Sequence, residues 1–510
     1  MRSAAGKWIM ISTILASSMA FIDGTALNVV LPALQKNLHA TGSDLFWVLN
    51  AYLLMLASLI LIGGSMGDKI GRKKVFVWGI LLFMAGSAAC GFAPGINFLI
   101  ACRAIQGIGG ALMIPGSLSI ISSSINKEER GKAIGTWSAF TTVVTMGGPV
   151  LGGALADAGL WRFIFFINIP IGVVAVLILI FRVKESADKS KDNTLDFPGA
   201  ITIALGLALL TFGFLRIPLI GFNHWEIYLS LAAGILFFIA FIFIESKSRH
   251  PMMPLKLFSN RVFSGVNLLT FFLYAGLGAG MLFLSLNMIQ AQGYTQLQSG
   301  LTFLPFTILM MSFARFAGRL ADKYGARKLL IAGPAAAGVG LLILSFVKQT
   351  NGAEDYWTSF FPGILVFGLG MSFTVAPLTA TVMSAADEHL SGTASGINNA
   401  MTRISNVFAN AVFGALAVLF FSNALQKDLQ KTSFNTKTKQ SIVAEAINLG
   451  DAKPPENIRS DKKLEVEKLY REGFIHSYGK IMQLAAGLAL TGALMSLFFI
   501  NNEKRKKEII

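Results

Sequence analysis

Fourteen apolar stretches, each about twenty residues or longer and bounded by charge or by glycine and proline, run along the chain. A helix needs about twenty apolar residues to cross a bilayer, so the pattern predicts fourteen transmembrane helices. Only 14% of the 510 residues are charged, against roughly 25% in a soluble domain. We therefore expect an all-α integral membrane protein with spans at 8–31, 44–65, 75–94, 97–120, 133–156, 162–182, 196–215, 225–244, 262–286, 297–320, 328–348, 357–382, 394–422 and 476–500.

The net charge of +16 is unevenly distributed between the two sides of the predicted bundle. Most lysines and arginines of the short loops fall on the side that holds both termini, whereas the opposite side has Lys36, Arg162, Arg216 and Lys348. Basic loops stay in the cytoplasm, so both termini are expected there. The charge is thus explained by membrane topology, and we expect no nucleic-acid partner.

Two related segments follow the second and tenth predicted helices, GSMGDKIGRKK at 64–74 and GRLADKYGARK at 318–328. Their corresponding positions predict two parallel halves of the kind found in rocker-type transporters. The expected division is a six-helix bundle at 1–195, two inserted helices with a linker at 196–250, and a second six-helix bundle at 251–510. The predicted gating residues, which would hold the cytoplasmic faces together in one conformation, are Gly64, Asp68, Gly71, Arg72, Gly318, Asp322, Gly325 and Arg327.

A long polar segment, residues 423–475, separates the last two predicted helices and is expected outside the cell. Its composition allows a solvated loop, a partly helical hairpin or a cap over the outer vestibule. These alternatives stay open at the level of sequence.

Asp23 lies within the first apolar stretch and has no lysine or arginine within a helical turn. A carboxylate at this depth costs roughly 2.5–3.5 kcal/mol, so we expect it to be protonated, released or paired. Arg103, in the fourth stretch, is expected at a similar depth, and the two side chains could meet. Such a pair would act as a proton switch if its burial or spacing changed with conformation. A static structural ion pair is the alternative.

The fifth stretch contains GGPVLGG at 147–153, whose small residues permit close helix packing and whose proline permits bending. Gly148, Pro149, Gly152 and Gly153 are therefore expected to form a tight seam. Arg403 is expected to reach the cytoplasmic face and is not assigned to substrate. Candidate substrate-site residues, of which some will only bond between helices, are Asn28, Asn50, Tyr52, Gln106, Trp137, Thr141, Asn267, Tyr274, Asn287 and Asn399.

These motifs, in this order and together with WRFIFFINIPIG at 161–172, resemble the major facilitator superfamily, and within it the fourteen-helix drug:proton antiporter branch of the EmrB/QacA type. The resemblance implies a 6 + 2 + 6 helix arrangement, proton coupling by Asp23, proton relay by Arg103 and an antiporter role for residues 148–153. It also implies a bacterial cytoplasmic membrane protein, functional as a monomer, which exports lipophilic drugs or biocides. The proton gradient would drive export without a cofactor or a metal site.

Some relatives that export divalent cations carry an acidic residue in the tenth helix, and residues 298–319 contain none. By this resemblance we expect monovalent cations or neutral amphiphiles as substrates. An exporter of an endogenous lipid, fatty acid or metabolite is the alternative. An integral-membrane enzyme is disfavoured because the histidines are scattered over loops and helix ends, without a dense His, Cys or acidic cluster.

Overall fold

The computed structural model describes residues 4–186, 196–249, 251–386, 390–456 and 458–500, and this part of the chain is almost entirely helical. Fourteen of its helical segments are long and apolar enough to cross a membrane, which confirms the predicted number. The helices are α1 (Ala4–Leu38), α2 (Gly42–Ile70), α3 (Arg72–Gly91), α4 (Ile96–Ser124), α5 (Lys127–Asp157), α6 (Phe163–Phe166), α7 (Asn168–Arg182), α8 (Phe197–Ile220), α9 (Trp225–Lys247), α10 (Arg261–Gln290), α11 (Gln296–Thr302), α12 (Leu304–Tyr324), α13 (Ala326–Ser345), α14 (Tyr356–Ser359), α15 (Phe361–Ser384), α16 (Ser391–Leu429), α17 (Thr436–Ala444) and α18 (Ser460–Phe499).

Local sequence determines where several helices begin. Thr41 before α2 and Thr295 before α11 form capping boxes with Asp44 and Gln298. The Asp196 carboxylate accepts from the Gly199 N–H at the start of α8. These side chains satisfy backbone N–H groups that have no partner within the helix.

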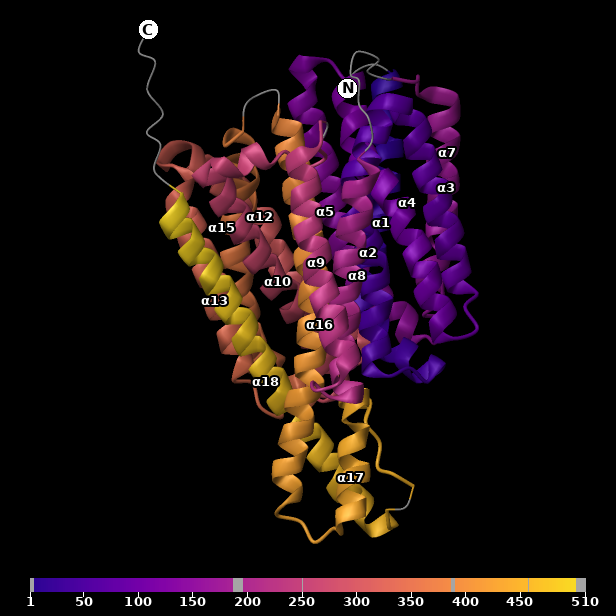
Figure 1. Ribbon diagram of the computed structural model, residues 1–510, viewed down its shortest axis with the longest axis vertical. Coiled ribbons are helices and arrows are strands. Elements are labelled where there is room, and N and C mark those ends of the chain that lie inside the picture. The colour runs from indigo at the N-terminus through magenta and orange to yellow at the C-terminus, as the bar shows by residue number, and fades with distance from the viewer. Residues whose placement is uncertain (1–3, 187–195, 250, 387–389, 457, 501–510) are drawn as a thin grey trace.

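Both described ends of the chain lie at one end of the bundle, here called the terminal end, and residues 423–475 project from the opposite end (Figure 1). We call these residues the hairpin, because α16 extends into them, α17 follows, and α18 leads back to the bundle. Ile442, Leu449 and Val466 are buried, and the Tyr470 hydroxyl donates to Ile442 O at 3.1 Å. The hairpin is therefore folded, as the partly helical alternative predicted.

The hairpin also contacts the first two helices of the chain. Gln35 Nε2 of α1 donates to Asn448 O at 3.0 Å, and Gln290 Nε2 of α10 donates to Gln35 Oε1 at 2.9 Å. A Cβ on Gly42, the first residue of α2, would lie 2.8 Å from Leu449 Cγ, so only glycine fits there without a shift. The hairpin is thereby attached to α1 and α2.

Helices α8 and α9 pack against each other, and α8 also packs on α2 and α16. Phe214 of α8 meets Phe408 of α16 at 5.9 Å between ring centroids. The other side of α9 exposes large apolar residues, including Leu236 and Phe243, each 64% exposed. Apolar exposure of this extent is expected of a helix that faces lipid.

Candidate functional site

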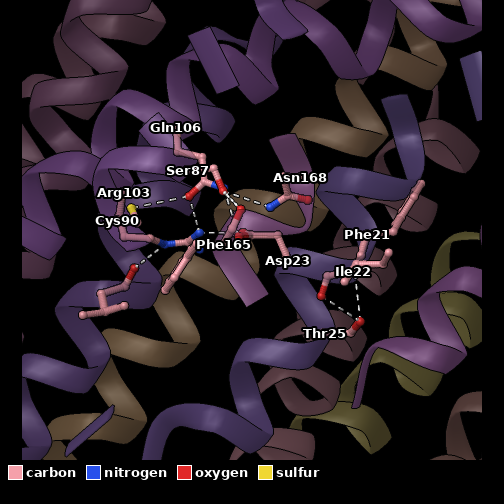
Figure 2. Close-up of polar contacts among 11 residues, drawn as sticks. Phe21, Ile22, Asp23, Thr25, Ser87, Cys90, Arg103, Gln106, Phe165 and Asn168 are labelled. Atoms are coloured by element: carbon pink, nitrogen blue, oxygen red, sulfur yellow. Dashed lines mark hydrogen bonds and ion pairs between the residues drawn. The ribbon is translucent and has the colours of Figure 1, made fainter. Parts of the chain in front are cut away.

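Asp23 of α1 and Arg103 of α4 form an ion pair, with 2.5 Å between Asp23 Oδ2 and Arg103 Nη1 (Figure 2). Gln106, one turn along α4, accepts from Arg103 Nη1 at 2.7 Å and donates to Asp23 Oδ1 at 2.9 Å. Each of the two charged side chains is 1% exposed. Both carboxylate oxygens of Asp23 thus have a donor, as a buried ionised carboxylate requires.

Helix α2 completes the surroundings of Arg103. Arg103 Nε donates to Val48 O at 3.2 Å, and its guanidinium carbon lies 4.4 Å from the centre of the Tyr52 ring. The backbones come this close because of glycine: a Cβ on Gly107 would lie 3.0 Å from Met55 Cβ. A bulkier residue at position 107 would push α4 and its arginine away from α2.

A second polar network borders this site and was not predicted from the sequence. Asn168, which is fully buried in α7, donates to Ser87 Oγ at 3.0 Å, and Ser87 donates to Phe165 O at 2.8 Å. Figure 2 shows this network beside the ion pair. A buried asparagine directly after an apolar run, as in FINIP, was the available signal.

The glycine motif of α5 packs on two helices. Toward α1, a Cβ on Gly148 would lie 3.2 Å from Thr25 Cβ, and one on Gly152 would lie 2.8 Å from Ala26 O. Toward α11, a Cβ on Gly153 would lie 2.7 Å from Leu297 Cα. The predicted tight seam is present, and it joins α5 both to the helix that carries Asp23 and to the second half of the chain.

Asp157, the last residue of α5, extends this contact at the hairpin end. Its carboxylate accepts from the backbone N–H groups of Gln296 at 2.9 Å and Leu297 at 3.0 Å, the first two residues of α11. A carboxylate at a helix N-terminus satisfies free N–H groups and the positive end of the helix dipole. The two halves are therefore held together at the hairpin end, and sequence inspection did not single out Asp157.

The two gating segments lie at the terminal end. Gly71 and Gly325 have φ values of 125° and 86°, which explains the glycine at both positions. The side chains of Asp68 and Asp322 lie outside the described residues, and Arg327 donates to Leu497 O at 3.1 Å.

Glu185, which sequence reasoning missed, accepts from the backbone N–H groups of Lys73 at 2.9 Å and Lys74 at 3.1 Å. It therefore caps α3 from within the first half of the chain. The remaining gating residues, Gly64, Arg72 and Gly318, lie in α2, at the start of α3 and in α12.

The candidate substrate-site residues separate into several groups. Tyr52 and Gln106 belong to the Asp23 site. Trp137 donates to Ser17 Oγ at 3.2 Å, and Thr141 donates to a carbonyl of its own helix. The polar groups of Trp137 and Thr141 thus bond to other groups of the protein, as expected for some of the candidate substrate-site residues.

The other candidates differ in burial. Asn267 accepts from Asn398 at 3.2 Å, whereas Asn50 and Asn287 are fully buried and their side-chain amides have no hydrogen-bond partner within the described part of the chain. Asn28 and Tyr274 are partly buried, and Asn399 is exposed. The structure therefore does not bring all ten candidates into one site.

Comparison with known proteins gives a consistent result. The family model of the Major Facilitator Superfamily matches residues 13–410. Multidrug resistance protein Stp of Mycobacterium tuberculosis is 30% identical over 444 residues, which cover 86% of this chain and 80% of that protein. Multidrug resistance protein 3 of Bacillus subtilis is 30% identical over 454 residues, 88% of this chain and 86% of that protein. A bacterial homologue of the human lysosomal transporter Spinster, solved inward-facing and unoccupied, has a TM-score of 0.69 at 17% identity, with 98% of each chain covered.

Proposed function

The chain belongs to the major facilitator superfamily, and we propose that it is a proton-coupled efflux antiporter for lipophilic, drug-like molecules. As a member of that family it is a multi-pass membrane transporter of small molecules and not an enzyme. Its relatives named above are multidrug resistance proteins. The observation that carries the proposed coupling is the buried Asp23–Arg103 pair, whose aspartate lies on α1, the helix that packs against the α5 glycine motif.

The contacts of Asp23 explain how a proton would act. In this conformation the ionised carboxylate has both Arg103 and Gln106 as donors. Protonation removes the negative charge and leaves the Arg103 charge buried without a counter-charge. Losing one partner of a buried pair costs about 3–5 kcal/mol. Proton binding to Asp23 therefore favours a different conformation, in which the site is hydrated.

The α5 seam would transmit this change. Thr25, two residues after Asp23, donates to Thr145 O of α5 at 3.1 Å and lies against Gly148. Movement of α1 around Asp23 therefore displaces α5, and α5 contacts α11 through Gly153 and Asp157. In the proposed cycle, Asp23 binds a proton from the hairpin end, opening at the terminal end follows, and substrate entry there is linked to proton release.

The basic loops support an orientation with the terminal end in the cytoplasm of a bacterium and the hairpin outside. Substrate would enter from the terminal end and leave at the hairpin end, while protons move inward through Asp23. The division into residues 1–195, 196–250 and 251–510, a monomeric working unit and the proton gradient as the only energy source belong to the same proposal.

The test uses everted membrane vesicles with a preset pH gradient. Added substrate should dissipate the gradient, and Asp23→Asn should abolish this response while the protein remains folded and in the membrane. Asp461→Asn, a change of the same kind on the exposed side of the hairpin, serves as the control and should behave like the parent. An Asp23→Asn variant that still exchanges protons at the parental rate would remove Asp23 from the mechanism.

A panel of probes separates drug export from export of an endogenous lipid. Ethidium, a divalent biocide, a neutral dye and a fatty acid would be compared in cells with and without the gene. Both functions would use the same Asp23 site, so the pattern of resistance has to separate them. Resistance only to the fatty acid would favour the lipid exporter.

A further inference from the structure

Arg403 lies deep in the bundle. The sequence predicted that its side chain reaches the cytoplasmic face, but its position along α16 is far from the terminal end. It is twelve residues beyond Ser391, where α16 begins, and 1.5 Å per residue places it about 18 Å along the helix. The neighbouring helix agrees, because Gly396 of α16 packs on Leu61 of α2, and Val407 clusters with Leu54. The hydrocarbon core is about 30 Å thick, so Arg403 is near its middle.

The side chain faces the interior of the protein. Asn399, Arg403, Asn406 and Asn410 recur every three or four residues on α16 and form what we call the inner stripe. The opposite face of α16 carries Ile404 and Phe408, which pack against α8. Lipid lies beyond α8 and α9, so the inner stripe points away from it.

The inner stripe lies between α2 and α10. The Arg403 guanidinium is within electrostatic reach of Tyr52 of α2 and Tyr274 of α10. Asn406 faces Gly278 of α10, and its side-chain carbonyl oxygen accepts no hydrogen bond from the residues that the structure describes. Tyr52 also stacks on Arg103, so its ring lies at the proton site and is at the same time within electrostatic reach of Arg403.

Arg403 has no counter-charge among the described residues. None of them forms an ion pair or a hydrogen bond with its guanidinium, whose nitrogens nevertheless stay accessible. Asp23, the nearby buried carboxylate, is already occupied by Arg103 and Gln106. An arginine at mid-membrane depth without a partner is costly, and such residues usually mark a binding site or an ion path.

Helix α12 adds positive charge toward the terminal end. Phe306 stacks on Phe367 of α15 at 5.1 Å, and Arg315, nine residues later, lies on the opposite face of α12. Arg315 and Arg319 are both exposed and have no ion-pair partner among the described residues. An arginine is more stable toward water than toward lipid, so we take this face to line the substrate route.

We propose that Arg403 binds an anionic group of the substrate, such as a carboxylate, phosphate or phenolate, so that acidic amphiphiles are exported in preference to cationic ones. This inference rests on the proposed function and narrows it: the unpaired guanidinium favours acidic and neutral molecules over the monovalent cations expected from the sequence. Arginine suits the role because its planar fork can donate two parallel hydrogen bonds to a carboxylate. Asn399 and Asn406 supply polar groups beside it.

The test compares three dansyl-labelled alkyl probes that differ only in their head group: a carboxylate, its methyl ester and a trimethylammonium. Binding to the purified full-length protein is measured by fluorescence. The parent should bind the carboxylate at least tenfold more tightly than the trimethylammonium probe. Arg403→Gln should weaken carboxylate binding about tenfold or more, as expected for a charge-assisted hydrogen bond, and change ester binding less than threefold.

Two further variants make the result specific. Arg403→Lys, which keeps the charge, should retain most of the selectivity. Arg261→Gln, an identical change at the exposed start of α10, should have no effect. Equal weakening of carboxylate and ester binding by Arg403→Gln, or tighter binding of the trimethylammonium probe by the parent, would overturn the proposal. The parent measurement decides by itself if Arg403→Gln does not fold.

Transport in proteoliposomes separates this inference from the proposed function. Exchange of one anion outward for one proton inward moves two charges, whereas exchange of a monovalent cation for a proton moves none. A valinomycin potassium potential, negative on the terminal side, should therefore accelerate carboxylate export. Loss of proton dependence for every probe refutes the antiporter. Proton-driven export that accepts the cationic probe best, without dependence on the potential, refutes only the role of Arg403.

Discussion

Replacement of Gly153 by alanine should shift the protein toward a conformation that is open at the hairpin end. The new Cβ would lie 2.7 Å from Leu297 Cα and 2.7 Å from Gln296 C, both backbone atoms of α11. Because these atoms cannot rotate away, α5 and α11 must separate by about 1 Å to restore an ordinary contact. Overpacking of this kind costs about 1–3 kcal/mol.

The cost applies only in the conformation in which α5 and α11 touch. It therefore destabilises that conformation relative to one in which the two helices are apart. Each 1.4 kcal/mol changes an equilibrium constant tenfold, and the population open at the hairpin end should rise by about fivefold to a hundredfold. Gly147→Ala is the matched control, because a Cβ there meets nothing within 4 Å. It lies on the same helix and carries the same change in helix propensity.

The assay follows the labelling rate of a cysteine introduced at Asn28, on the hairpin side of Asp23 in α1, by a membrane-impermeant maleimide added from that side. The native Cys90 and Cys102 are buried and would be replaced by alanine and serine in the background. Gly153→Ala should label faster than the parent, and Gly147→Ala should not. Equal rates for all three proteins would refute the view that the α5–α11 seam holds the hairpin end closed.

Three other outcomes are expected. Arg103→Ala should lower the unfolding free energy by about 3–5 kcal/mol, because Asp23 stays buried without its partner. Adding Asp23→Asn to the same protein should restore part of the loss in denaturation experiments. If the two substitutions changed the unfolding free energy additively, a direct interaction between the two side chains would be contradicted. A short cleavable bis-maleimide that joins cysteines introduced at Gln35 and Asn448 should stop transport until it is cleaved, because the crosslink fixes the hairpin on α1. Unchanged transport would mean that this contact persists throughout the cycle. Desolvation raises the pKa of Asp451 above its ordinary value of 3.8, so the folded protein holds this proton to a higher pH than the unfolded chain, and the stability that the protonated form contributes is lost as pH rises above about 3.8. Asp451→Asn should therefore raise the melting temperature at pH 7 and lose this advantage near pH 4. A pH-independent effect would exclude titration of Asp451 as the cause.

The number of spans follows from composition. A run of about twenty apolar residues is stable only as a helix in the membrane or as a buried helix in a very large core. The depth argument also anticipated that Asp23 and Arg103 could meet, since both were placed at a similar depth below the same face of the bundle. By contrast, Gln106 was grouped with substrate candidates, although it completes the hydrogen bonds of Asp23. Helix spacing alone does not specify which of two neighbouring partners an amide will choose.

The sequence by itself determined that the chain has fourteen segments able to cross a membrane, that Asp23 and Arg103 lie at a similar depth, and that α5 can pack closely on other helices. These properties depend on local composition and on the fixed rise of a helix. Tertiary structure decided which faces meet: Gly153 and Asp157 on α11, Asn448 on Gln35, and Arg403 within electrostatic reach of Tyr52 and Tyr274, with no ion-pair partner among the described residues. Such contacts join residues far apart in the chain, and their energies depend on the rotation and separation of whole helices, which no local pattern encodes.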